Sequence, residues 1–198
     1  MLTLAFDTTA NGVSVAVLRD KDIVAQDYRA MARGQGEALI PMIQRLIQQA
    51  DLHMADLDQV AVTVGPGSFT GVRVGLAAAR GIGLALKIPV RGITTLAASA
   101  YGTTGRILAV LDTKRGDFYT QLFQDGTPLE GPAIRTAKQI QALFPVALVG
   151  TGVAPLSDVI SCTTANPAEA LAVPAGLLSL DGGLPAEPIY LRDADVSI

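Results

Sequence analysis

The stretch GPGSFTGVRVGLAAARGIGLA, residues 65–85, begins as a glycine-rich turn and continues as a long apolar segment of unusually small residues. Within it, Gly71, Gly75, Ala79 and Gly83 are spaced four apart, so a helix would carry them as one stripe along a single face. Each glycine inside a helix costs about 1 kcal/mol relative to alanine. The three glycines therefore require compensation, and very close packing along the stripe is its simplest source.

Two catalytic interpretations of this stretch fail on spacing. A P-loop requires GxxxxGK[ST], but Thr70 stands where the second glycine belongs and the stretch holds no lysine. A nucleophile elbow requires GxSxG, whereas Ser68 stands in the segment PGSFT, and the single histidine, His53, lies in a polar stretch elsewhere. We therefore predict that Ser68 is the N-cap of a helix, whose N-terminus is at most a weak anion site.

The stripe of small residues has two possible partners. It could pack on the chain's own sheet or on an amphipathic helix that apolar spacing predicts over residues 37–49. Alternatively, a helix of another chain could lie on it, with Arg73 and Arg80 beside the stripe as polar contacts. The residues alone leave both alternatives open.

Composition and charge argue against several classes of function. With 198 residues, 49% of them hydrophobic, the chain can form one compact domain or two small lobes. A net charge of −3 gives no basic footprint for nucleic acid, so any RNA contact would need a partner to supply positive charge. One cysteine and one histidine exclude an internal disulfide and give no zinc site of the usual type.

The N-terminus does not resemble a signal peptide, because it lacks a basic region and Asp7 interrupts its apolar run. The longest apolar run, over residues 74–90, is broken by Arg80 and Lys87 and falls short of the roughly 18–20 uncharged residues of a membrane span. We expect a cytoplasmic protein without a membrane contact.

Apolar patterning predicts a first lobe over residues 1–103. Three strands, over residues 2–6, 12–18 and 23–29, precede the helix over 37–49, a strand over 60–64 and the helix of the opening stretch. A strand over 88–93 and a short helix over 95–101 follow. This order is that of a ribonuclease-H-like half, in which helical crossovers make the later strands parallel.

A second, reduced lobe of related topology is predicted over residues 104–198. It begins with a meander over 107–112 and 117–124, followed by a helix over 136–144 and a strand over 146–150. A helix within 167–180 is interrupted by Pro174, and the last eighteen residues look irregular. The fold class predicted is therefore α/β, with a mixed sheet and flanking helices.

The first hairpin turn, Asp7-Thr8-Thr9, resembles the phosphate-contacting turn of actin-like and hexokinase-like ATPases, where a carboxylate often acts through a metal ion. The alternative is an ordinary polar turn whose side chains satisfy backbone groups, and the residues favour that interpretation. The segment 112–116 occupies the equivalent turn of the second lobe. The chain beyond the possible adenine-side turn at 150–152 looks too reduced to complete a nucleotide pocket.

Five segments in order make the sequence resemble the bacterial TsaB family, also called YeaZ-like proteins. The resemblance extends over nearly the whole chain, and the segments that carry it are LAFDTTANGVSVAV, LIPMIQRLI, VGPGSFTGVRVGLAAARGIGLA, LDTKRGDFYTQLF and PIYLR at 188–192. The resemblance implies the two-lobe actin-like ATPase (ribonuclease-H-like) fold and a role in making threonylcarbamoyladenosine, next to the anticodon of tRNA. It also implies a non-catalytic scaffold, a degenerate paralogue of the catalytic subunit TsaD.

The same resemblance implies partners and a contact surface. TsaD would bind the first two helices, the ATPase TsaE would join the pair, tRNA would be reached through the complex, and the isolated chain would form a homodimer. No cofactor is implied, beyond weak ATP or ADP binding at Asp7, Thr8 and Thr9, favoured in the assembled complex. The residues expected to contact TsaD are Leu39, Met42, Ile43, Gly71, Arg73, Gly75, Leu76, Ala79 and Arg80.

Two departures from the family pattern bear on this interpretation. Gln35 stands where many relatives have a histidine, and the second lobe is short for the family. The alternative is an enzyme, either a metal-dependent peptidase or a sugar-kinase-like ATP-dependent enzyme. The lack of metal ligands and of a base argues against the peptidase, and the short second lobe argues against the kinase.

Overall fold

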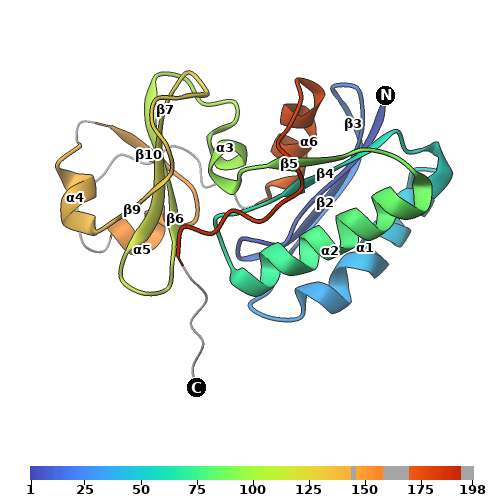
Figure 1. Cartoon of the computed structure of the whole chain (residues 1–198), viewed down its shortest axis with the longest axis horizontal. Coiled ribbons are helices and arrows are strands. Elements are labelled where there is room, and N and C mark those ends of the chain that lie inside the picture. Colours follow the sequence, from blue (N-terminus) through green and yellow to red (C-terminus); the bar gives the residue numbers. More distant parts are fainter. Residues whose placement is uncertain (144–145, 158–169, 193–198) are drawn as a thin grey trace.

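The chain forms two sheets with helices on their faces (Figure 1). The structure is a computed structural model that describes residues 1–143, 146–157 and 170–192. The first sheet has the strand order β3-β2-β1-β4-β5, and the second has the order β10-β6-β7-β8, with β9 also pairing with β7. The predicted α/β class and mixed sheet are confirmed.

The first sheet contains an antiparallel meander extended by parallel strands. Its strands are β1 (Leu2–Asp7), β2 (Gly12–Arg19), β3 (Asp22–Ala30), β4 (Gln59–Thr63) and β5 (Val90–Ile93). Strand β1 pairs antiparallel with β2 and parallel with β4, which pairs parallel with β5. Every residue of β1 and β4 is buried, so both faces of these mostly apolar strands are covered.

Two helices, α1 (Gln35–Gln49) and α2 (Phe69–Leu86), lie side by side on one face of the first sheet (Figure 1). The buried stripe of α1 consists of Leu39, Met42, Ile43, Leu46 and Ile47. The predicted amphipathic helix is confirmed, but Ile40, which the apolar spacing placed on the buried face, is exposed. A short 3-10 helix, η1 (Met54–Asp56), leads from α1 to β4.

Helix α2 begins as predicted, because the Ser68 Oγ accepts a hydrogen bond of 3.2 Å from the Gly71 amide. Its stripe of small residues is buried against the chain's own sheet, which decides between the two alternatives left open by the sequence. A Cβ on Gly75 would lie 2.7 Å from the Thr8 Oγ1. By length and composition alone α2 could cross a membrane, but here this stripe covers the sheet.

The second sheet is smaller and its elements are shorter. Its strands are β6 (Arg106–Asp112), β7 (Phe118–Gln124), β8 (Thr127–Pro128), β9 (Ala133–Arg135) and β10 (Ala147–Val149). Helix α3 (Thr95–Ala100) packs on one face, while α4 (Ala137–Gln141) and α5 (Val153–Ser157) cover the other. The helix predicted over 136–144 is therefore only five residues long, with Thr136 as its N-cap, and residue 144 lies outside the described residues.

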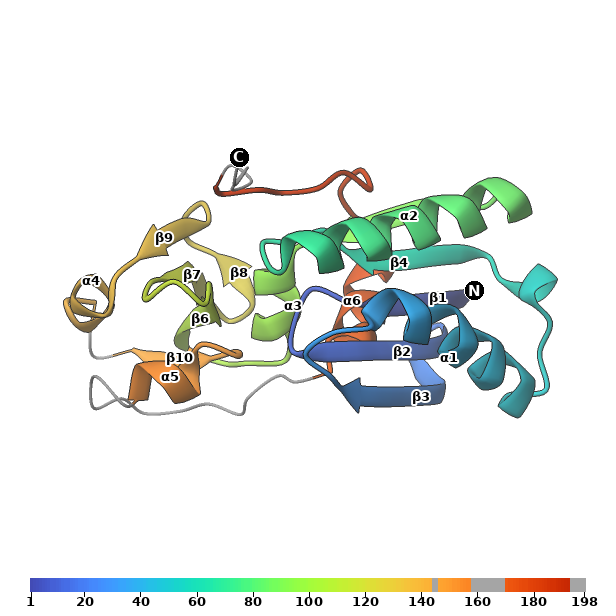
Figure 2. The same cartoon turned by 90° about the horizontal axis from the view of Figure 1, so that it is seen from below.

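Helix α6 (Ala172–Leu180) returns to the first sheet and packs on the face opposite to α1 and α2 (Figures 1 and 2). The buried Gln59 Nε2 donates to the Ser179 Oγ at 3.0 Å, which ties α6 to β4. Pro174 does not interrupt α6, because it lies in the first turn, where an N–H has no helical acceptor. The lobe boundary after residue 103 stays a prediction. The structure adds that the chain returns from the second sheet to the first one as α6.

The segment of residues 183–192, which we call the strap, has no helix or strand of its own apart from one bridge pair. Leu184 exchanges two backbone hydrogen bonds of 2.8 Å with Gly92 on β5, and the Ile189 amide donates to the Val64 carbonyl at 2.8 Å. The strap runs past the N-terminal end of α2 to the second sheet (Figure 2).

Candidate functional site

A cleft of about 310 Å³ separates the two sheets. Four segments supply most of its lining: the turn after β1, the loop before α2, the turn between β6 and β7, and the strap. Thr95 at the start of α3 and Thr151 after β10 complete it. Actin-like proteins would place a phosphate-contacting turn here, so the contacts made by the two turns decide what this cleft can do.

Asp7 is buried within the first turn and serves as its common acceptor. Its Oδ1 accepts hydrogen bonds from the Thr9 amide at 3.0 Å, from the Thr9 Oγ1 at 2.5 Å and from the Thr63 Oγ1 at 2.5 Å. Burial raises the pKa of Asp7 above its ordinary value, although the hydrogen bonds from Thr63 and Thr9 lower it in part. The carboxyl group faces its own turn and β4, and it does not line the cleft.

Other polar groups of the first turn form hydrogen bonds with the first turn of α2 and with the loop before it. The Thr8 Oγ1 donates to the Gly71 carbonyl at 2.6 Å, and the Thr9 carbonyl accepts from the Ser68 amide at 3.0 Å. A Cβ on Gly67 would lie 2.7 Å from the Thr9 carbonyl oxygen, and one on Gly71 would overlap the Thr8 carbonyl. Of the three residues predicted as a weak nucleotide site, only Thr9 reaches the cleft.

The equivalent turn between β6 and β7 is open and charged. Lys114 pairs with Asp112, with 2.9 Å between the Nζ and Oδ2 atoms, and Arg192 of the strap pairs with Asp117. The hydrogen bond from Thr113 lowers the pKa of Asp117, and the charge of Arg192 lowers it further. Lys114 and Arg192 are thus each paired with a carboxylate beside them.

The residues predicted to contact a partner divide into two groups. Arg73 and Arg80 are exposed on α2. The other seven are buried in the core of the chain: Leu39, Met42, Ile43, Gly71, Gly75, Leu76 and Ala79. They hold α1 and α2 on the sheet, so any partner of these helices would meet their opposite faces.

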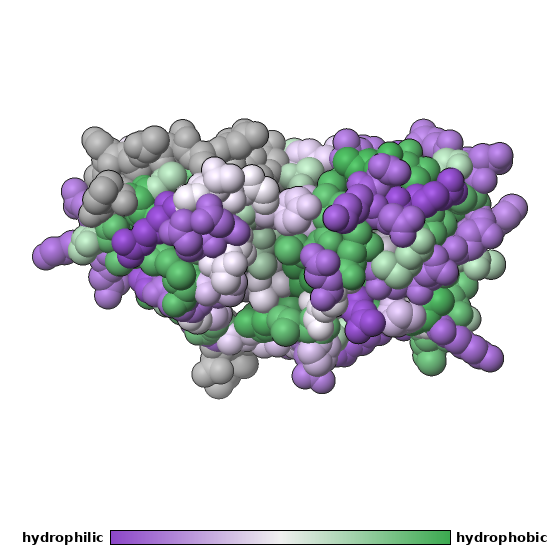
Figure 3. All heavy atoms as spheres, turned by 90° about the horizontal axis from the view of Figure 1, so that it is seen from above, coloured by the Kyte–Doolittle hydropathy of each residue, from purple (hydrophilic) through white to green (hydrophobic). Residues whose placement is uncertain are grey.

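The outward faces of α1 and α2, which the sequence argument missed, carry exposed apolar side chains. Leu84 is 82% exposed and Ile40 is 42% exposed. Gly81 is exposed as well, and a Cβ there would meet nothing within 4 Å. The signal was available in the sequence, because Ala77, Gly81 and Leu84 form a second small or apolar stripe at helical spacing. By contrast, hydrophobic and hydrophilic residues are interspersed on the face shown in Figure 3.

Metal-binding groups are scarce in the described part of the chain, where no three His, Cys, Asp or Glu residues are grouped to hold an ion. Gln35, which stands in the place of a family histidine, donates through Nε2 to the Met31 carbonyl at 3.4 Å. Cys162 lies outside the described residues.

Comparison with known proteins gives consistent matches. A family model described as TsaD, tRNA N6-adenosine threonylcarbamoyltransferase, matches residues 29–161. An uncharacterized protein of Mycobacterium tuberculosis is 34% identical over 97% of this chain and 92% of its own length. The tRNA threonylcarbamoyladenosine biosynthesis protein TsaB of Bacillus subtilis is 32% identical over 63% of this chain and 56% of its own length.

The fold also matches a solved structure. YeaZ from Pseudomonas aeruginosa superposes with a TM-score of 0.79 at 25% identity, over 96% of this chain and 99% of the other. This match confirms the predicted fold class over nearly the full length of the chain.

Proposed function

Because this chain is a TsaB-like member of the family described as TsaD, tRNA N6-adenosine threonylcarbamoyltransferase, we propose that it serves tRNA threonylcarbamoyladenosine biosynthesis as a scaffold subunit. In this proposal it performs no chemistry itself and binds a TsaD subunit through the outward faces of α1 and α2. TsaE and tRNA join through that complex, and without TsaD the same faces pair two copies of this chain.

The observation that carries the proposal is the hydrogen bonding of the first turn to α2 and to the loop before it. Its hydroxyl and carbonyl groups bind the loop before α2 and the first turn of α2, from Thr8 to Gly71 and from Ser68 to Thr9. A turn that contacts phosphate must present such groups to the cleft. Here the same groups fix the position of α2. A helix that presents a surface to a partner requires such a fixed position.

The second support is the surface that this arrangement leaves outside. Isolated apolar residues on a surface need no explanation, but Ile40 and Leu84 project from two adjacent helices on the same face of the sheet. A paired helix would remove these side chains from water, at roughly 25 cal/mol per Å² of apolar area.

The test is complex formation with the TsaD subunit of the same organism, measured by light scattering after size exclusion. Gly75→Trp is unsuitable, because Gly75 is buried against Thr8 and the variant would test folding. Gly81→Trp adds bulk to the outward face of α2, where a side chain has open space. Gly131→Trp, at an equally open glycine of the second lobe, is the matched control.

We expect the unchanged protein and Gly131→Trp to form a complex with TsaD, and Gly81→Trp to remain separate while keeping its thermal unfolding transition. A complex that tolerates Gly81→Trp would contradict the proposed surface. A protein that ignores TsaD altogether would overturn the scaffold role.

The proposal also covers the cofactor: this subunit needs no nucleotide to bind TsaD. Calorimetric titration of the isolated chain with ATP and ADP should give no binding at micromolar concentrations. Tight binding that is lost when Thr9 is replaced by valine would instead support the kinase-like alternative, because Thr9 is the residue of the first turn that lines the cleft.

A further inference from the structure

The strap borders the outward face of α2 on one side. The guanidinium group of Arg80 donates to the Ala186 carbonyl, with 2.9 Å from its Nε, and the ring of Tyr190 lies 5.0 Å from the ring of Phe69, centre to centre. At its far end, Arg192 pairs with Asp117 of the second lobe. A protein that binds the outward face of α2 therefore also contacts the strap.

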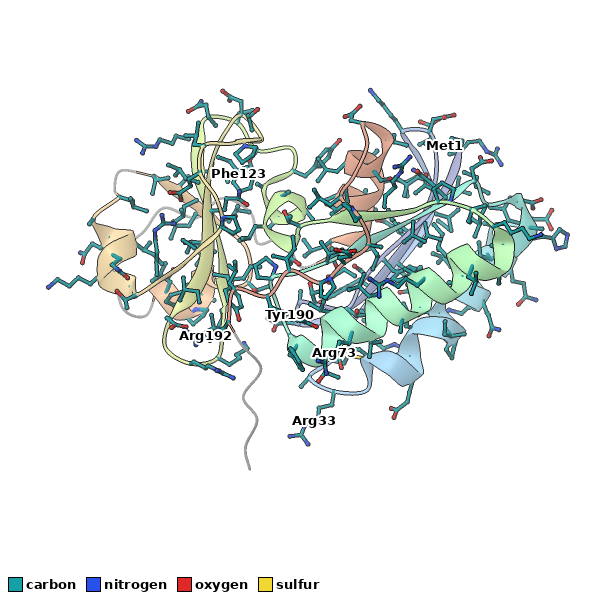
Figure 4. All side chains as sticks on the ribbon, in the orientation of Figure 1. Met1, Arg33, Arg73, Phe123, Tyr190 and Arg192 are labelled. Atoms are coloured by element: carbon teal, nitrogen blue, oxygen red, sulfur yellow. The ribbon has the colours of Figure 1, made fainter. Side chains whose placement is uncertain are left out.

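Arg73 is held at this border by two aromatic side chains. Its guanidinium carbon lies 3.8 Å above the centre of the Phe69 ring, and its Nε donates to the Tyr190 Oη at 3.3 Å. Figure 4 shows Arg73 and Tyr190 beside each other where the strap passes α2. Stacking fixes the plane of the guanidinium group, so less side-chain entropy is lost when it binds a further group.

The charge of this region is positive, although the chain as a whole carries −3. Helices α1 and α2 contain one acidic residue, Glu37, against Arg45, Arg73 and Arg80. The strap adds one residue of each sign, Glu187 and Arg192, so the sum stays positive. Arg45 pairs with Asp27. Among the described residues, no carboxylate pairs with Arg73 or Arg80, whose donors go to a tyrosine hydroxyl and a backbone carbonyl. Arg33, in the loop before α1, extends on the same side (Figure 4).

We propose that Arg73, preorganised by Phe69 and Tyr190, is the recognition point for a carboxylate on the partner subunit, and that the strap forms one rim of the docking surface. This inference rests on the proposed function, since the occupant is the TsaD subunit. It adds the PIYLR segment of the strap, residues 188–192, to the contact surface. It also predicts that the partner presents an acidic side chain to this surface. Arginine and tyrosine are among the residue types enriched at the positions that dominate binding energy in protein interfaces.

The experiment is calorimetric titration of the full chain with the TsaD subunit at several salt concentrations. Arg73→Met removes the charge and keeps an apolar stem, and Tyr190→Phe keeps the ring but removes the hydroxyl that holds Arg73. Arg19→Met, at an exposed arginine at the end of β2, is the matched control. Thermal unfolding of each variant confirms its fold.

We expect Arg73→Met to weaken binding about tenfold and to make the affinity less sensitive to salt, because one ion pair is lost. Tyr190→Phe should weaken binding by a smaller factor, and Arg19→Met should match the unchanged protein. Affinity of Arg73→Met within twofold of the unchanged protein, or an equal salt dependence, would overturn the inference while leaving the scaffold role intact. An unchanged protein that does not bind TsaD would overturn both.

Discussion

The two hairpin turns at the cleft use similar residues in opposite ways. In the first lobe, Asp7 is buried, its pKa is raised, and its turn lies beneath α2. In the second lobe, Asp117 is partly exposed, its pKa is lowered, and its turn faces water with matched charges. Both turns bring together an aspartate and a threonine, so residue type alone does not explain the difference.

The difference teaches that a covering helix decides what a polar turn does. Where α2 approaches closely, the threonine hydroxyl and the carbonyls of the turn become part of the core. Where no helix covers the turn, the threonine hydroxyl bonds within its own turn, as the Thr113 Oγ1 does when it donates to the Asp117 carbonyl oxygen at 2.9 Å. Substitutions in the two turns should therefore have unequal effects.

The largest effect is expected at the closest approach of α2 to the first turn. Gly71→Ala would force a Cβ onto the Thr8 carbonyl, so we expect a loss of about 3 kcal/mol in the free energy of unfolding. Gly116→Ala in the second turn has open space and only a positive φ of 83° to oppose it, which costs about 1–2 kcal/mol. Urea unfolding of both variants measures the comparison.

Gly81→Ala, in open space on the same helix as Gly71, is the control and should stabilise the protein by about 1 kcal/mol. Equal losses in the free energy of unfolding for Gly71→Ala and Gly116→Ala would mean that α2 is not in close contact with the first turn.

The next effect is expected at the two threonines. Thr8→Val keeps the side-chain volume but removes the buried hydrogen bond to the Gly71 carbonyl, at a cost of about 1–3 kcal/mol. Thr113→Val removes hydrogen bonds that water can replace, so the loss should stay below about 1 kcal/mol. Unfolding by guanidinium at one pH gives both values. A larger loss in the free energy of unfolding for Thr113→Val than for Thr8→Val would contradict the proposed difference between the two turns.

The pH dependence of stability should have opposite signs at the two aspartates. Because the folded pKa of Asp7 is raised, the folded chain holds this proton more tightly than the unfolded chain does. The stability of the unchanged protein relative to Asp7→Asn should therefore fall as pH rises above about 4. Because the pKa of Asp117 is lowered, stability relative to Asp117→Asn is present above about pH 4 and is lost as pH falls below it.

Unfolding curves of the three proteins across this range, from about pH 3 to about pH 7, test both signs. Parallel pH profiles for the two variants would show that the two carboxyl groups do not differ in environment.

The smallest effect is expected at the ion pair between the strap and the second turn. The Arg192 and Asp117 side chains are 30% and 20% exposed, so Arg192→Met should cost less than about 1 kcal/mol, and salt should reduce this cost further. Thermal unfolding at low and high salt provides the measurement. A loss above about 2 kcal/mol would mean that this pair holds the two lobes together.

Much of the fold could be predicted from the sequence, because its determinants are local. The apolar run of β1, the apolar spacing of α1 and the cap at Ser68 depend on neighbours within a few residues, and the structure confirms the strand, the helix and the cap. The match to five ordered segments also pointed to the family. Short elements such as α4 were overestimated, because five residues carry little periodicity.

Which face of α2 meets the sheet could not be predicted, since its two sides are both rich in glycine and alanine. That choice depends on contacts between distant residues, such as the hydrogen bond that joins Thr8 to Gly71 across 63 positions. For the same reason the return of α6 to the first sheet and the path of the strap were not foreseen. The sequence by itself determined the longer helices and strands, because capping and periodicity act between near neighbours. Only tertiary contact decided which surface became core and which stayed free for a partner.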